Sequence, residues 1–121
     1  MPQALASLLT QQQKPVPNPI SGVALLDTGA SISAVDATVI QSLGVSPVGV
    51  TTLHTPSGTS QQNQYPVRFE FPGSNLPAIE TQRAIGSLLQ QQGIIALIGR
   101  DVLASFVFVY NGPGGFITLA F

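Results

Sequence analysis

The sequence predicts a single all-β domain with one or two short helices, and two observations carry this prediction. The chain has 121 residues, which is close to the usual size of one domain. Its 12 glycines and 10 prolines separate short apolar runs, a spacing typical of brief strands joined by turns rather than of a helical bundle. We therefore expect a sheet-based fold with a core of its own.

The N-terminal part, residues 1–19, is expected to lead into the main domain, which covers residues 20–121. A first strand is predicted at residues 3–9. Residues 10–19 (TQQQKPVPNP) are predicted to form a polar connector, because their three prolines exclude a regular element. The next strand, at residues 20–26, ends in four consecutive apolar residues, as expected for a strand that is buried on both faces.

A short helix is predicted after this strand. Ser33 and Asp36 have the spacing of a capping box, and Gly44 is suited to end the helix. Apolar residues recur between them at helical spacing, namely Val35, Val39, Ile40 and Leu43.

The rest of the chain is predicted to form strands, with one further helical segment. The strands are expected at residues 49–54, 64–71, 78–85, 94–98, 106–110 and 116–121. The first two are joined by a turn at 55–60 that contains Pro and Gly, and the last two form a terminal hairpin. Residues 86–93 are expected to be a loop or a helical turn, and residues 99–105 one or two helical turns.

Charged residues are scarce, and this excludes several classes of partner and chemistry. Four Lys and Arg stand against five Asp and Glu, for a formal net charge of −1, whereas nucleic-acid binding needs clustered cations. The absence of cysteine excludes thiol catalysis, disulfides and iron–sulfur sites. His54 is the only histidine, so we expect no metal, and we expect no other cofactor.

No apolar run reaches the roughly 18 residues that a membrane span needs, and no signal peptide is recognised. We therefore expect no membrane span in this chain. The compartment is left open, as is the presence of flanking domains or an anchor in a larger protein.

Asp27 is the strongest candidate for chemistry. It directly follows an apolar strand, and Gly29 allows the backbone to turn tightly beside it. A carboxylate held in this way is desolvated and rigidly oriented, which makes it a candidate acid or base. The same residues also suit an ordinary turn in which Asp27 binds its own backbone, so this segment alone leaves both interpretations open.

A second segment favours the catalytic interpretation. The apolar run at 94–98 leads into Gly-Arg-Asp at 99–101, followed by a short helix. Together with ALLDTGAS at 24–31 and the Gly-tipped hairpin between the two segments, this order resembles the retropepsin-like aspartic proteases over about residues 20–121. The resemblance implies an acid-protease-like closed β barrel, a single lobe that pairs as a homodimer.

The resemblance also implies roles for individual residues. Asp27 is the expected catalytic residue of an aspartic endopeptidase, Thr28 is expected to clamp the active-site loops through its hydroxyl, and Gly29 to bring the backbone close to the substrate. Support for the active-site loops is expected from Ala30, Ile98, Gly99, Arg100 and Asp101. The flap that closes over a bound peptide is expected at Thr55, Pro56, Ser57, Gly58 and Thr59.

Two features depart from the retroviral members of that family. Those members commonly carry an acid that pairs with the distal arginine, whereas this chain has Ser-Ile at 31–32. Arg100 therefore needs another partner, for which we consider a backbone carbonyl, Asp101 or Asp36. The C-terminal hairpin at 106–121 is longer than a single short strand and is closer to cellular or bacterial members.

Peptide hydrolysis by an activated water uses two carboxylates that share one proton, and this chain supplies one of them. Of its three aspartates, Asp27 alone has Gly at the second following position. A homodimer would supply a second Asp27 across a twofold axis. The expected substrate is an extended peptide or protein segment with apolar residues around the scissile bond.

Two other interpretations are kept beside this one. The first is a non-catalytic module with the same fold that binds peptides or dimerises. The second is a phosphate-associated loop at residues 27–29, which lacks the Gly-rich cradle and Lys of such sites. A Ser-His-Asp triad would have to recruit His54 from a hairpin strand.

Overall fold

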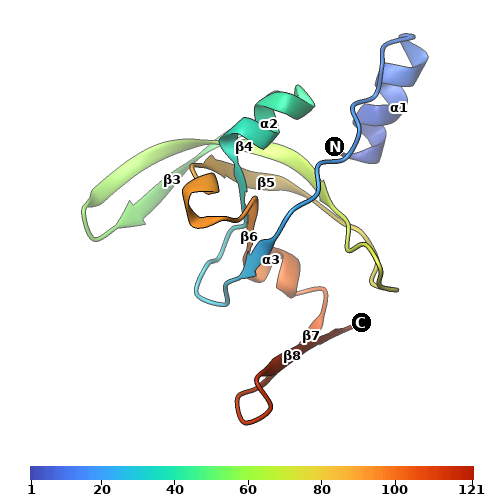
Figure 1. Ribbon diagram of the computed structural model, residues 1–121. Coiled ribbons are helices and arrows are strands. Elements are labelled where there is room, and N and C mark those ends of the chain that lie inside the picture. The colour runs from blue at the N-terminus through green and yellow to red at the C-terminus, as the bar shows by residue number, and fades with distance from the viewer.

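The computed structural model describes residues 1–121 and is mostly β, which confirms the predicted class at this level (Figure 1). The strands are β1 (Ala24–Leu26), β2 (Ala34–Asp36), β3 (Gly49–Thr55), β4 (Gly58–Phe69), β5 (Ile79–Ser87), β6 (Ala96–Ile98), β7 (Val107–Asn111) and β8 (Phe116–Ala120). The helices are α1 (Gln3–Gln11), α2 (Ala37–Leu43), the 3-10 turn η1 (Gln90–Gln92) and α3 (Arg100–Leu103). None of these helices is long and apolar enough to cross a membrane.

Six strands form one sheet in the order β1-β6-β2-β5-β4-β3, and β7 and β8 form a separate two-stranded sheet. The pairs β1/β6 and β2/β5 are parallel, and the other pairs are antiparallel. The large sheet has two open edges, β1 and β3, so the predicted closed barrel does not form in this chain. The short β1 has a neighbour on one side only, because the N-terminal residues add no strand to it.

The predicted strand at residues 3–9 is wrong, because these residues lie in the helix α1. The segment QALASLLTQ contains no β-branched residue before Thr10, and Ala, Leu and Gln all favour the helix. The connector that follows has no regular element from Lys14 to Pro19, as predicted, whereas Thr10 and Gln11 of the predicted connector lie in α1.

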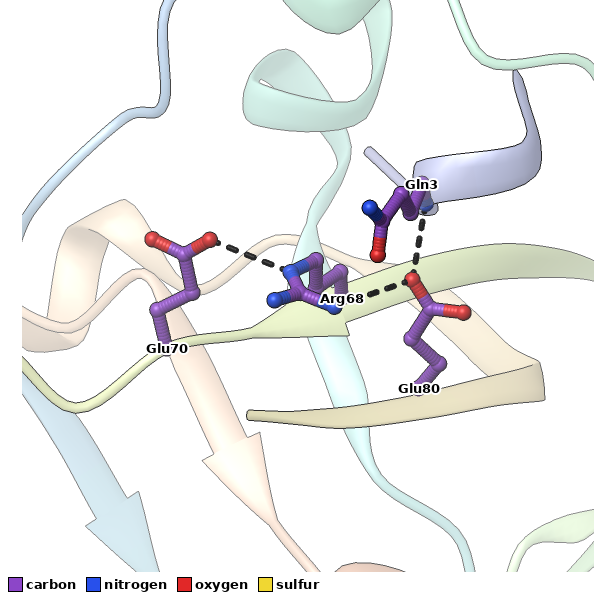
Figure 2. Close-up of polar contacts among 4 residues, drawn as sticks. All are labelled: Gln3, Arg68, Glu70 and Glu80. Atoms are coloured by element: carbon purple, nitrogen blue, oxygen red, sulfur yellow. Dashed lines mark hydrogen bonds and ion pairs between the residues drawn. The ribbon is translucent and has the colours of Figure 1, made fainter. Parts of the chain in front are cut away.

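Polar contacts tie the start of α1 to the large sheet (Figure 2). The Gln3 amide donates to the Glu80 carboxylate of β5 at 2.7 Å. Arg68 on β4 lies between Glu80 and Glu70, with N–O distances of 3.4 and 3.1 Å. Hydrogen bonding to Glu70 is the main reason that the pKa of Arg68 is raised above its usual value. The Gln3 contact orients the start of α1, and the two ion pairs of Arg68 are at the surface and contribute little to stability.

The segment before Asp27 also differs from its prediction. The strand covers only the last three of residues 20–26, and it lies at a sheet edge rather than in the middle. Leu25 is therefore 48% exposed instead of buried on both faces. A continuous apolar run does not distinguish a buried central strand from an exposed strand at the edge of a sheet.

The predicted helix around residue 40 begins later than expected. Ser33 does not cap it, because residues 34–36 form the buried strand β2. Asp36 instead caps α2 by accepting a hydrogen bond from the Thr38 amide at 3.1 Å. Gly44 ends the helix in the left-handed conformation, with φ of 67°, as predicted.

Two apolar clusters form the core. One lies between α2 and the sheet and contains Val35, Val39, Ile40, Val45, Val67 and Ala84. The other contains Ala96, Ile98, Val102 and Leu103, and Phe108 and Leu119 of the C-terminal hairpin pack against it. The second cluster thus joins β6 to α3, the short helix that follows it.

Asp36 is the one charged residue in the core, and its stabilising effect is expected to depend on pH. Hydrogen bonds from the Thr38 side chain, and then from the Leu89 and Gln90 amides, hold the pKa of Asp36 below its ordinary value of 3.8. The contribution is therefore complete above about pH 4 and is lost as the pH falls through the lowered folded-state pKa. We expect the difference in urea midpoint between wild type and Asp36→Asn to be large at pH 7 and to shrink towards pH 2.5. A difference that stays constant over this range would contradict the prediction.

Candidate active site

Asp27 lies immediately after β1, in a turn that fixes its carboxylate. The parallel register pairs Leu26 with Ile98, and the Asp27 amide donates to the Ile98 carbonyl at 2.9 Å. The Gly29 amide donates to Asp27 Oδ1 at 2.8 Å, and the Ala30 amide donates to the Asp27 carbonyl at 3.2 Å. The turn interpretation and the catalytic one are therefore compatible. Oδ1 is anchored, while Oδ2 of the partly exposed carboxylate has no partner within the chain.

Arg100 finds its partner in the backbone, one of the three possibilities considered. Its Nη1 donates to the Thr28 carbonyl at 2.7 Å, and its amide donates to the Ala30 carbonyl at 2.8 Å. No ion pair joins it to Asp101 or Asp36. The guanidinium thus ties the segment after β6 to the turn that carries Asp27.

Gly99 is needed where these two segments meet. It is buried, and a Cβ atom built on it would lie 2.9 Å from the Ala30 carbonyl oxygen and 3.0 Å from the Ile32 carbonyl carbon. Both contacts are with backbone, which cannot move aside as a flexible side chain does.

We expect Gly99→Ala to force the two segments apart and to destabilise the fold by about 1–3 kcal/mol, the usual effect of overpacking. Thermal unfolding with a urea series measures this loss. Gly93→Ala tests backbone strain without crowding, because Gly93 has φ of 74° and no atom near its Cβ position. A Gly99→Ala protein as stable as wild type would contradict the close approach.

Ser33 and Asp101 complete the contacts between the segments. Asp101, which was predicted to support the site, accepts hydrogen bonds from Ser33 Oγ at 2.6 Å and from the Ser33 amide at 3.1 Å. Ser33 was missed as a site residue, because its sequence context favoured a helix cap. These two residues are 68 positions apart, so no local pattern could have paired them.

The remaining predicted loop residues fall in two environments. Ile98 is 2% exposed and packs in the second core cluster, as a residue behind the loop should. Thr28 is exposed, and its hydroxyl forms no hydrogen bond within the chain. The clamping role expected of this hydroxyl therefore requires a group from outside the chain.

The predicted flap residues lie at the tip of the β3–β4 hairpin, which projects from one end of the large sheet (Figure 1). Thr55 pairs with Gly58, so Pro56 and Ser57 form a two-residue turn. Gly58 has φ of 132°, which other residues rarely adopt, and the Thr55 hydroxyl donates to its carbonyl at 3.0 Å. All five residues are exposed, as a segment that closes over a ligand requires.

A mainly apolar cavity lies away from Asp27. It has a volume of about 570 Å³ and lies between the N-terminal segment and the strands β1, β4 and β6. Neither Asp27 nor the flap residues line it. It offers no group for acid–base chemistry beyond the paired Arg68 and Glu70, so Asp27 stays the candidate acid or base.

No family model and no curated protein matches this chain. The resemblance to aspartic proteases therefore rests on the two motifs and on the contacts between them. No group of three or more His, Asp or Glu side chains is placed to hold a metal ion.

Proposed function

We propose that this protein is an aspartic endopeptidase that works as a homodimer. The observation that carries this proposal is the state of the Asp27 carboxylate. One oxygen is held by the Gly29 amide at 2.8 Å and the other is free, on a turn tied by Arg100 to the segment behind it. An oriented carboxylate with a free oxygen is what a water-activating dyad needs from each of its two halves.

Two such carboxylates share one proton, because two like charges about 3 Å apart cannot both ionise. The ionised Asp27 takes a proton from the attacking water, and the protonated one donates to the carbonyl oxygen of the scissile bond. Each chain offers one carboxylate in this setting, so the second comes from another copy across a twofold axis. No metal or cofactor takes part in this scheme.

The C-terminal hairpin supports a second copy as the partner. Val107, Val109 and Phe116, which we call the hairpin face, are 60%, 51% and 56% exposed. A two-stranded sheet is marginally stable alone, and this one packs on the core through its other side, at Phe108 and Leu119. No charged side chain occurs from Val102 to Phe121, so two copies can meet there without repulsion.

The exposed apolar surface of the whole chain points in the same direction. Only 17 of 121 residues are buried, whereas 14 large apolar side chains are exposed. Six of these 14 side chains lie between Val107 and Phe121, and apolar surface gathered in one segment is typical of a contact site.

The proposed substrate is an extended peptide with apolar residues on both sides of the scissile bond. The flap hairpin contains no Asp, Glu, Lys or Arg between Gly49 and Gln62, and neither does the floor from Thr28 to Val35. A charged substrate side chain would find no counter-charge there and would lose its hydration. The peptide backbone would bind through main-chain hydrogen bonds.

Mass spectrometry of a proteome-derived peptide library, incubated with the protein from about pH 4 to 7, tests this proposal over the range in which a carboxylate pair titrates. We expect cuts between apolar residues. A folded dimer that makes no cut at any pH would contradict catalysis and would favour the non-catalytic peptide-binding module.

A further inference from the structure

Ser33 occupies an unusual position for a small polar residue, because it is fully buried between the two segments of the candidate site. Its hydroxyl donates to Asp101 Oδ1 at 2.6 Å and accepts from the Gly99 amide at 2.9 Å. Its own amide donates to Asp101 Oδ2 at 3.1 Å. Every hydrogen-bonding group of the side chain is therefore used, and each partner belongs to the segment after β6.

Asp101 is held in the same network without a cation. Besides Ser33, its Oδ1 accepts from the Val102 amide at 2.9 Å, whereas the neighbouring Arg100 turns to the Thr28 carbonyl. A carboxylate that is satisfied by three fixed donors is rigid, and it holds the Ser33 hydroxyl in one rotamer. We call the chain of contacts from the Asp101 carboxylate through the Ser33 hydroxyl to the Gly99 amide the Ser33 relay.

The Ser33 relay sets how closely Gly99 approaches the Asp27 turn. No side chain fits between Gly99 and this turn, because a Cβ atom on Gly99 would lie 2.9 Å from the Ala30 carbonyl oxygen. The next residue, Arg100, makes both hydrogen bonds to that turn, at 2.8 and 2.7 Å. A shift of Gly99 would therefore move both of these bonds and, through them, the carboxylate.

We propose that Ser33 is a positioning residue for Asp27 and that it acts through the Ser33 relay. The turnover part of this inference rests on the proposed peptidase function, whereas the positioning part does not. Loss of the hydroxyl leaves the Gly99 amide without a partner and removes one of the three donors to the Asp101 carboxylate, so the Asp27 turn loses its fixed distance from β6.

The test compares Ser33→Ala and Asp101→Asn with Val39→Ala, a control that removes buried atoms from the other core cluster and touches no residue of the site. The hydrogen-exchange rate of the Gly29 amide reports directly on how firmly the Asp27 carboxylate is held, because this amide donates to Asp27 Oδ1. The Val48 amide, which donates to the Gln64 carbonyl at the base of the flap hairpin, serves as the internal reference for global loss of stability.

We expect both relay variants to raise Gly29 exchange about 10-fold relative to Val48, as local opening does. Their kcat should fall on the order of 100-fold with KM nearly unchanged, which is the usual result of a misplacement of about 1 Å. The double variant should lose no more activity than the more impaired of the two single variants, because both residues act in one network. Val39→Ala should leave the exchange ratio and kcat unchanged.

Three results would overturn the inference. The first is a Ser33→Ala protein that matches Val39→Ala in the exchange ratio and in kcat. The second is strictly additive losses in the double variant. The third applies if only one of Ser33→Ala and Asp101→Asn folds, and it is a wild-type ratio of Gly29 to Val48 exchange in that variant. Should wild type cleave no peptide, the proposed function fails, but the exchange ratio still decides whether the relay positions Asp27.

Discussion

Asp27→Asn is expected to abolish peptide cleavage and to leave both the fold and the dimer intact. Asn has the same shape and keeps an oxygen that accepts from the Gly29 amide, whose bond to Asp27 Oδ1 is 2.8 Å long. It cannot take a proton from water, and general acid–base catalysis alone contributes up to about 10⁴-fold. Rates on library-derived peptides should therefore fall at least 10³-fold, a loss within that range. Sedimentation and thermal unfolding should match wild type.

The matched control is Glu70→Gln, which neutralises an exposed carboxylate at the end of β4, away from the candidate site. It should cleave at the wild-type rate. A protein with Asp27→Asn that cleaves as fast as wild type would show that another group or another protein makes the cuts. The catalytic role of Asp27 would then be abandoned.

Val109→Lys is expected to separate the two chains and to abolish activity in the same step. Val109 is 51% exposed at the centre of β7 and belongs to the hairpin face. A twofold interface meets this substitution twice, so two lysines would be buried without a counter-ion, because no acid occurs from Val102 to Phe121. We expect the dimer to dissociate about 100-fold more readily, which corresponds to a modest 2.7 kcal/mol.

Analytical ultracentrifugation measures this change, and peptide cleavage at the same concentrations measures its effect on activity. Leu88→Lys is the control, since Leu88 is 73% exposed just after β5 and lies outside the hairpin. A monomeric Val109→Lys protein that retains full activity would refute the shared pair of carboxylates. A dimer of wild-type strength would place the interface elsewhere.

The sequence was most informative where a turn residue and an alternating pattern occur together. The β3–β4 hairpin, the end of α2 at Gly44 and the C-terminal hairpin all follow from Gly and Pro positions with strand-like runs on either side. These features depend on neighbours in the sequence, so local chemistry is enough to predict them.

The errors arose where distant segments decide the structure. Residues 34–36 read as the first turn of a helix, but pairing with both β5 and β6 makes them a strand. The strand expected at 3–9 had no partner in the sheet, and its Ala and Leu residues form a helix instead. In both segments, tertiary pairing or its absence overrode the local pattern.

The candidate site was predictable in part for the same reason. Asp27 and Gly29 stand next to each other in a short motif, and the backbone partner of Arg100 was one of three candidates. Ser33 could not be found, because its role depends on Asp101 and Gly99, which reach it only through the antiparallel pairing of β2 with β6.

Each chain carries one Asp27, and this places the proposed enzyme under the control of its own abundance. In dilute solution, where monomers predominate, the number of complete sites rises with the square of the protein concentration. Doubling the amount of protein would then increase total turnover about fourfold, until dimers saturate and the relation becomes linear. Such a protein is nearly silent when scarce and becomes active abruptly where copies gather, without a modification or an effector. Anything that tethers two copies together, at a concentration far below the dissociation constant, would act as a switch.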